Sequence, residues 1–215
     1  MQSDPQTAGA HQLREDLTQH YEVLRELGDC YAALGDERRA GQCYTEAAAL
    51  APEKAGPHVG MGVLAIQSGR LGQAEDAFET AAAKEPRCAE AYGGLAMIRQ
   101  QRQDYAGAFE MYLKCLELDS DNLVALLGLF QTSCQMGSFA KVIHYLEMYL
   151  DRHPGDTSVQ FCLATLYARE GKLELAEKTL LNVLVLEPDK PEARDLLHDV
   201  RKELAAMQPQ NAVSA

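Results

Sequence analysis

The fold is decided by two stretches of the chain that resemble each other. Residues 61–86 read MGVLAIQSGRLGQAEDAFETAAAKEP, and residues 95–120 read LAMIRQQRQDYAGAFEMYLKCLELDS. With an offset of 34 residues, Met61 aligns with Leu95 and Phe78 aligns with Tyr112. A fixed period of this length is the signature of a repeat architecture.

The same register continues in both directions along the chain. Prolines at 52, 86, 154 and 188 keep it, and so do three columns of residues spaced 34 apart. The columns are Leu27, Met61, Leu95, Leu129 and Leu163; Gly28, Gly62, Ala96, Phe130 and Ala164; and Ala40, Ala74, Ala108, Val142 and Ala176. The register predicts five repeats without insertion, at residues 21–54, 55–88, 89–122, 123–156 and 157–190.

Each repeat is predicted to be a pair of helices joined by a turn. In the first repeat, Leu24, Leu27, Tyr31 and Leu34 follow helical spacing, and Gly35 then interrupts the pattern. Glycines recur at this point in three other repeats (Gly69, Gly137 and Gly171), and they suit the left-handed residue that follows a helix. A second helical pattern ends near each proline, which cannot continue a helix.

The ends of the chain fall outside the five repeats. Residues 1–20 are predicted to form an N-terminal tail, with residues 1–9 frayed, and a helix that extends or caps the first repeat. Residues 191–206 are predicted to form a closing helix, followed by a tail at 207–215. Such covers are needed because a stack of repeats leaves apolar surface at each end.

The sizes of the repeating residues predict how the helices pack. Small residues that face each other, such as Gly28 and Ala40, are expected where the two helices of a pair cross closely. Aromatic residues such as Tyr44 and Phe78 are expected to fill the space between successive pairs. In the fourth repeat Phe130 and Val142 replace both small residues, so that pair is predicted to be splayed or rotated.

Composition excludes several classes of function. The chain has 215 residues, 32 acidic and 20 basic side chains, and a formal net charge of −12. A nucleic-acid binder is not expected, because such proteins neutralise phosphates with a basic patch. No membrane insertion is expected, since no apolar stretch approaches the length of a span. The polar N-terminus lacks a secretory signal, and a cytoplasmic location is expected.

No catalytic or metal-binding pattern is found. The six cysteines, at positions 30, 43, 88, 115, 134 and 162, have no zinc-ligand spacing, so reduced thiols, most of them in the core, are expected. The six histidines fall at unrelated positions of the repeat, and no nucleophile or phosphate-loop motif is present. The sequence therefore predicts no enzyme, no cofactor and no metal.

The pattern resembles the tetratricopeptide repeat family. The resemblance rests on Leu24, Leu27, Gly28, Tyr31, Ala40, Tyr44, Ala47 and Pro52, and on the matching residues of the second repeat. It implies an all-α fold, a right-handed α-solenoid of five helix-turn-helix repeats with a C-terminal capping helix. The frequent tryptophan of the family is absent from every repeat.

The resemblance also implies a binding groove along the first helix of each repeat. When the groove positions of the family are carried over to this sequence, those of the first repeat are Glu22, Arg25, Asp29, Ala32 and Ala33. The second position of the repeat is Gly56 in the second repeat and Glu90 in the third. The candidate peptide-binding residues are Val59, Val63, Ile66, Gln67, Met97, Gln101, Leu127, Gln131, Gln135, Phe161, Thr165 and Arg169. Six of these form an apolar stripe, and three of the four glutamines, Gln67, Gln101 and Gln135, form a column spaced by 34 residues that could hold the register of a peptide. In the alternative interpretations, local packing or the N-terminal segment covers the stripe, and the glutamines are ordinary polar residues before a turn.

The leading prediction is a non-catalytic protein-interaction scaffold that binds a peptide or helix of another protein. The lysine and asparagines that would grip a C-terminal carboxylate are missing from the groove positions, so an apolar or amphipathic ligand is preferred. Two alternatives stay open: a regulatory or assembly subunit of a larger enzyme, and a self-associating module. In the self-associating module, the groove accepts the segment around Leu13, Leu17 and Tyr21 of another copy.

Overall fold

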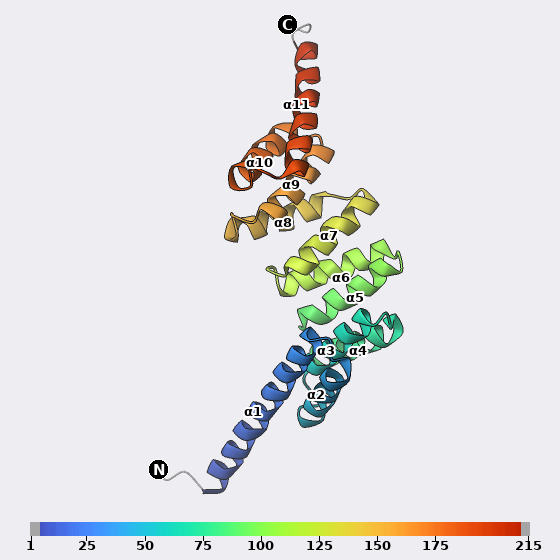
Figure 1. Ribbon diagram of the computed structural model, residues 1–215, viewed down its shortest axis with the longest axis vertical. Helices are drawn as coiled ribbons and strands as arrows, with labels where there is room; N and C mark the ends of the chain where they lie inside the picture. Colours follow the sequence, from blue (N-terminus) through green and yellow to red (C-terminus); the bar gives the residue numbers. More distant parts are fainter. Residues whose placement is uncertain (1–4, 212–215) are drawn as a thin grey trace. The chain divides into compact units, whose positions relative to one another are not determined.

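The protein is helical throughout the part that the structure, a computed structural model, describes. It describes residues 5–211, with side chains for residues 15–207, and contains eleven helices and no strand in that range. The helices are α1 (Pro5–Ala33), α2 (Glu37–Leu50), α3 (Gly56–Gln67), α4 (Leu71–Lys84), α5 (Ala89–Gln101), α6 (Tyr105–Leu118), α7 (Leu123–Met136), α8 (Ala140–Arg152), α9 (Thr157–Arg169), α10 (Leu173–Leu186) and α11 (Pro191–Asn211). Figure 1 shows these helices in sequence order. Within the described range, no helix combines the length and apolar character that crossing a bilayer requires.

The helices follow one another in pairs, as the repeat predicts. The chain divides into two compact units, Met1–Leu118 with α1 to α6 and Asp119–Ala215 with α7 to α11. We call them the N-terminal unit and the C-terminal unit. In each, second helices pack on the first helix of the next pair, as α2 does on α3 and α8 on α9. The fold is therefore of the all-α, helical-repeat class.

The turn inside each pair uses the left-handed conformation that the glycine column predicts. Gly35, Gly69, Gly137 and Gly171 have φ between +68° and +75°. In the first repeat the amide of Gly35 donates to the carbonyl of Ala32 and that of Asp36 donates to Tyr31, which closes the end of α1. The third repeat has Gln103 at this position, and its φ is also positive, at +65°.

We expect Gln103→Gly to raise the free energy of unfolding by about 1 kcal/mol, because a side chain in the left-handed region costs about that much. Urea denaturation followed by circular dichroism measures the change. Gln101→Gly is the matched control: it lies at the end of α5, and glycine there should lower stability. A Gln103→Gly variant no more stable than the wild type would contradict this account of the turn.

An aromatic ring clamped between two glycines joins each of the first two pairs to the next. A Cβ atom built on Gly28 would lie 2.5 Å from the ring of Tyr44, and one on Gly60 would lie closer still. Gly62 stands in the same relation to Phe78, at 2.7 Å, and Gly94 closes the other side of that ring. Only glycine permits such an approach, because any side chain would overlap the ring.

This arrangement changes the role predicted for the small residues. Gly28 and Gly62 had been expected to face Ala40 and Ala74 at the helix crossing, but the nearest atoms to each glycine belong to the aromatic ring. Ala40 and Ala74 are nevertheless fully buried beside the same rings. The small first-helix residue therefore makes room for a ring that also reaches the next pair.

The α7–α8 pair is looser than the others, as the bulky Phe130 and Val142 predict. These two helices come close at far fewer points than the helices of the other pairs. Val142 is fully buried, whereas Phe130 is partly exposed. The loose pairing agrees with the larger side chains at these two positions of the repeat.

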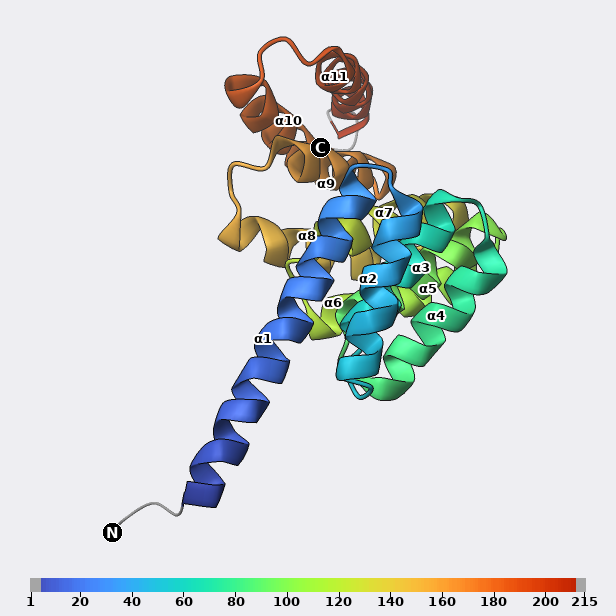
Figure 2. The ribbon, with the colours of Figure 1, turned by 60° about the horizontal axis from the view of Figure 1, so that its bottom comes forward.

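The first helix differs from the prediction in two respects. It begins at Pro5, so residues 5–9 are helical although they were expected to be a frayed tail, and both views show it running past the other helices of its unit (Figures 1 and 2). Leu27 and Leu34, two of the apolar residues whose spacing predicts this helix, are 41% and 79% exposed, and Leu34 lies just past the end of α1. At the other end α11 runs to Asn211, so residues 207–211, predicted to be part of the tail, are helical too. The expected tails at 1–4 and 212–215 lie outside the described residues, as does the side chain of Leu13.

Candidate functional site

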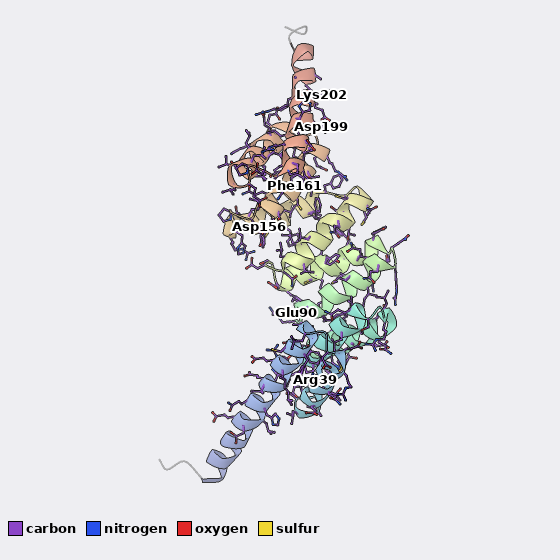
Figure 3. The ribbon with its side chains drawn as sticks, viewed as in Figure 1. Arg39, Glu90, Asp156, Phe161, Asp199 and Lys202 are labelled. Atoms are coloured by element: carbon purple, nitrogen blue, oxygen red, sulfur yellow. The ribbon has the colours of Figure 1, made fainter. Side chains whose placement is uncertain are left out.

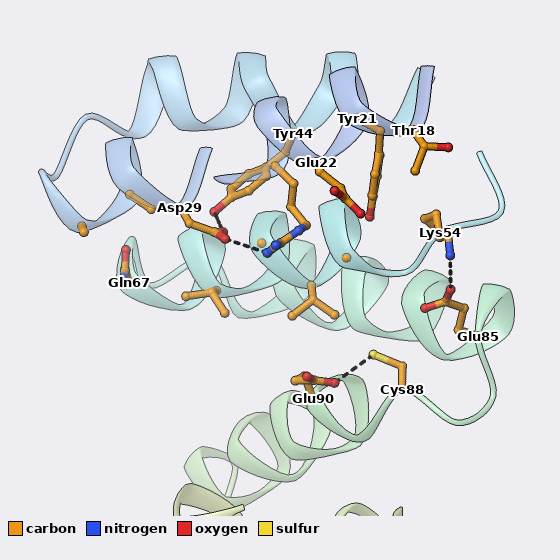
Figure 4. A pocket seen from close by; sticks show the side chains of 17 residues that line it. Thr18, Tyr21, Glu22, Asp29, Tyr44, Lys54, Gln67, Glu85, Cys88 and Glu90 are labelled. Carbon is orange, nitrogen blue, oxygen red and sulfur yellow. Dashed lines mark hydrogen bonds and ion pairs between the residues drawn. The ribbon is translucent and has the colours of Figure 1, made fainter. Parts of the chain in front are cut away.

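A cleft of about 720 Å³ lies in the N-terminal unit, along α1 and α3 and beside the start of α5. Its walls include the first-helix positions that the family resemblance implied: Glu22, Arg25, Asp29, Ala32, Ala33, Gly56, Val59, Val63, Gln67 and Glu90. Figure 4 shows Asp29 and Glu22 above the cleft, Gln67 at one end and Glu90 below. Three of the twelve candidate residues, Val59, Val63 and Gln67, therefore come together there.

The two cations of the cleft are each held by a carboxylate. Arg25 Nη1 donates to Asp29 Oδ2 at 2.9 Å, and the hydroxyl of Tyr44 donates to the other oxygen of Asp29 at 2.8 Å. Lys54 Nζ lies 3.8 Å from Glu85 Oε1. Asp29 is therefore held by two donors. One of them is the hydroxyl of Tyr44, whose ring is clamped between Gly28 and Gly60.

Two further carboxylates, Glu22 and Glu90, have no cationic partner among the described side chains, and both are exposed. Cys88 Sγ donates to Glu90 Oε2 at 3.4 Å, which leaves the negative charge of Glu90 uncompensated. The cleft contains four carboxylates and two cations, so its charge at neutral pH is negative. Such a surface favours positively charged ligand groups.

The chemistry of the cleft suits binding. Burial raises the pKa of the Cys88 thiol to about 11, and the neighbouring Glu90 acts in the same direction. The thiol therefore stays protonated near neutral pH, when a nucleophilic cysteine would need to be a thiolate. Burial also raises the pKa of Tyr44, and its hydrogen bond to Asp29 adds to the shift.

The apolar floor of the cleft is accessible. Val63 is 41% exposed and Val59 is partly exposed, while Ala32 and Ala33 continue the floor from α1. The N-terminal half of α1 does not fold back over these residues (Figures 1 and 2). Thr18 and Tyr21 instead line the edge of the cleft.

The other candidates of the N-terminal unit lie outside the cleft walls. Ile66 is partly buried and packs against the cluster around Phe78. Met97 is also partly buried, and Gln101 is exposed at the end of α5. The structure does not bring these three residues together with Val59 and Val63 in one cavity.

Six candidates belong to the C-terminal unit and are described there on their own. Gln131, Gln135 and Arg169 are exposed, and Leu127, Phe161 and Thr165 are partly exposed. The Phe161 ring lies 5.8 Å from Lys190 Nζ, and Thr165 donates its hydroxyl to the Phe161 carbonyl at 2.8 Å. The Arg169 guanidinium lies 5.9 Å from the Phe139 ring. Each of these side chains is reachable from solvent.

Sequence reasoning missed several residues of the cleft. Tyr44 lies on a second helix, Lys54 and Glu85 lie in the turns that precede α3 and α5, and Thr18 lies before the first repeat. The groove positions carried over from the family describe only first helices. The signal that could have found Lys54 and Glu85 is their opposite charge in adjacent inter-repeat turns.

Comparisons with known proteins agree with this architecture. Residues 21–54 and 59–122 match models of the tetratricopeptide repeat. The chain is 30% identical over 139 residues to the mitochondrial import receptor subunit TOM70 of Homo sapiens. That stretch covers 60% of this chain and 20% of the receptor, so the chain spans about a fifth of the length of this relative.

Solved structures of similar fold have low sequence identity to the chain. PilF of Pseudomonas aeruginosa has a TM-score of 0.65 at 19% identity, over 90% of this chain and 94% of its own. YrrB, described as a TPR protein with an unusual peptide-binding site, has a TM-score of 0.63 at 17% identity, over 89% of this chain and 97% of its own. The first TPR of Spaghetti (RPAP3), solved with the HSP90 peptide SRMEEVD, has a TM-score of 0.50 at 25% identity, over 56% of this chain and 95% of its own. With its paired helices, left-handed turns and matching repeat models, the chain belongs to the tetratricopeptide repeat family.

Proposed function

We propose that the protein is a non-catalytic interaction module and that the cleft of its N-terminal unit binds a peptide or a helix of another protein. The observation that carries the proposal is an accessible apolar floor, Val59 and Val63, bordered by the unpaired carboxylates Glu22 and Glu90. A ligand with an apolar side and at least one lysine or arginine would fit both features. A cytoplasmic location is part of the proposal.

The charge of the cleft argues against an acidic ligand. The peptide bound to the first TPR of Spaghetti contains the sequence EEVD. In the present cleft Arg25 and Lys54 are already paired with Asp29 and Glu85. An acidic peptide would have to compete with these partners and face Glu22 and Glu90. We therefore propose a ligand of the opposite charge.

The proposal is tested by selecting ligands from a phage-displayed library of random short peptides on the full chain. We expect selected peptides to combine apolar residues with lysine or arginine, and their affinity to fall at least tenfold for Val63→Asp, which places a charge on the apolar floor. Isothermal titration calorimetry with synthetic copies of the peptides measures this change.

Val185→Asp is the matched control, because Val185 is 77% exposed on α10 of the C-terminal unit. It should bind the selected peptides like the wild type. Circular dichroism should show both variants folded. Peptides that bind Val63→Asp as tightly as the wild type would refute the proposed site.

A further inference from the structure

One carboxylate of the cleft, Asp29, is held in place from inside the protein. Tyr44 is 2% exposed, and its ring lies between Gly28 and Gly60. Its hydroxyl nevertheless reaches the cleft and donates to Asp29 Oδ1 at 2.8 Å (Figure 4). The side chain of Asp29 is 51% exposed, so a ligand can reach it. A buried donor thus fixes the orientation of a carboxylate that faces solvent.

The hydroxyl of Tyr44 is not required for packing. At the aligned position of the second repeat, Phe78 packs between two glycines without a hydroxyl. In the third repeat the aligned residue is Tyr112, and its hydroxyl donates at 2.7 Å to Gln100 Oε1 on the first helix of that repeat. The ring at this position therefore serves packing, and the hydroxyl, where it is present, holds a polar side chain of the first helix.

The second oxygen of Asp29 already binds a cation of the protein itself. Arg25, one turn earlier on α1, donates from Nη1 to Asp29 Oδ2 at 2.9 Å. Both side chains are exposed to solvent, and the arginine precedes the acidic residue, which is the less favourable order on a helix. Exposed pairs of this kind contribute little to stability. Arg25 can therefore give up its place on Asp29 to another cation without loss of the fold.

The other carboxylates of the cleft are not oriented in this way. Glu22 and Glu90 are exposed, and the hydrogen bond that Glu90 receives comes from the Cys88 thiol, a weak donor, at 3.4 Å (Figure 3 labels Glu90, and Figure 4 draws the contact). Glu85 Oε1 lies 3.8 Å from Lys54 Nζ, beyond hydrogen-bond distance. A side chain that is oriented in advance loses less conformational freedom when a ligand binds. The carboxylate held by the buried tyrosine is therefore the best prepared to select a ligand.

We propose that Asp29 selects an arginine of the ligand, that Tyr44 is the positioning residue of Asp29, and that Arg25 occupies the place of the ligand arginine until the ligand displaces it. The inference rests on the peptide-binding function proposed for the cleft and adds the chemistry of the side chain that is recognised. Each oxygen of an ionised carboxylate can accept more than one hydrogen bond, so both oxygens remain available to a ligand. A planar guanidinium can bond both oxygens at once, whereas the ammonium of lysine binds as a point charge.

Titration of the isotope-labelled full chain with the blocked dipeptide acetyl-Leu-Arg-amide, followed by NMR, tests this inference. We expect the amide shifts of Val59 and Val63 to give a lower dissociation constant for this arginine probe than for acetyl-Leu-Lys-amide or the uncharged acetyl-Leu-citrulline-amide. Arg25→Gln should tighten binding of the arginine probe about threefold, because the competing cation is gone, and Asp29→Asn should weaken it at least threefold. Arg38→Gln, exposed on α2 outside the cleft walls, makes the same change in net charge as Arg25→Gln and should bind the probe like the wild type.

Tyr44→Phe tests the positioning role without a change in net charge. The variant should fold, because Phe78 shows that a phenyl ring fits between the two glycines of such a clamp. It should weaken binding of the arginine probe about threefold, and this loss should disappear when Asp29→Asn is already present. A merely structural role of the hydroxyl would give the same loss in both backgrounds and would overturn the assignment.

The failure of this inference can be told apart from the failure of the cleft as a binding site. If the library-selected peptides lose affinity for Val63→Asp but Arg25→Gln binds the arginine probe no tighter than the wild type, the cleft stands and this inference is wrong. The same holds if the probe leaves the amides of the cleft unshifted. Selected peptides that bind Val63→Asp as tightly as the wild type would refute the cleft, and this inference with it.

Discussion

Replacement of Phe78 by alanine is expected to lower the free energy of unfolding by about 3–5 kcal/mol, the range for removing a buried aromatic ring. Phe78 is 1% exposed and fills the space between Gly62 and Gly94 on two successive first helices. Its loss opens a cavity against both helices, which backbone movement cannot fill without breaking the pairing of α4 with α5. Urea denaturation monitored by circular dichroism measures the effect.

The clamp itself is tested by the partner substitution Gly94→Leu. Alone, it should cost about 1–3 kcal/mol, because the new side chain overlaps the ring of Phe78. Combined with Phe78→Ala, the leucine has the vacated space to occupy, so the double variant should be less destabilised than the sum of the two single changes. Val185→Ala, at an exposed position, should cost less than about 0.5 kcal/mol. Strict additivity of Phe78→Ala and Gly94→Leu would contradict the contact.

Reversal of both unpaired carboxylates, Glu22→Lys with Glu90→Lys, is expected to weaken binding of a cationic peptide by about tenfold to a hundredfold. An exposed ion pair contributes up to about 1 kcal/mol, and a lysine replaces that attraction by repulsion. The difference between wild type and variant should shrink as salt is added, because exposed charges are screened. Calorimetric titration at low and high salt measures both effects.

Glu110→Lys, on an exposed position of α6 outside the cleft, serves as the control for net charge. It changes the charge of the protein but leaves the cleft intact, so its affinity should match that of the wild type. If Glu110→Lys weakened binding as much per charge as the cleft variant, the contribution would come from the overall field of the protein.

The helical pairs were predictable because each repeat carries its own local signals. The glycine at the turn, the proline after the second helix and the small or aromatic residues between them specify five similar structures. Gln103 was not recognised as a left-handed residue, because the prediction depended on glycine and here the hydrogen bonds of the turn impose the conformation. The looseness of α7 and α8 was predictable because the distance between two packed helices depends on the side chains at their contact.

The candidate site was predictable only where one helix could be considered alone. All five family positions on α1 and four of the five on α3 line the cleft. Ile66 on α3 and Met97 on α5 do not, since their exposure depends on how the next helix packs. Tyr44 could be assigned to the core from its position. Its hydrogen bond to Asp29, which links the core to the cleft, was not predictable. The position of the Tyr44 ring depends on Gly28 and Gly60, and their spacing of 32 residues differs from the 34-residue period of the repeat.

The glycine clamps also decide where this chain can be cut. A fragment that ends at residue 54 contains a whole number of sequence repeats, but it leaves Tyr44 with Gly28 on one side and solvent on the other. A fragment that ends at Gln67 retains α3, and with it Gly60 and the second wall of the ring. In the first two repeats, the natural building block for shortening or grafting the protein is therefore three helices long and overlaps its neighbour by one helix.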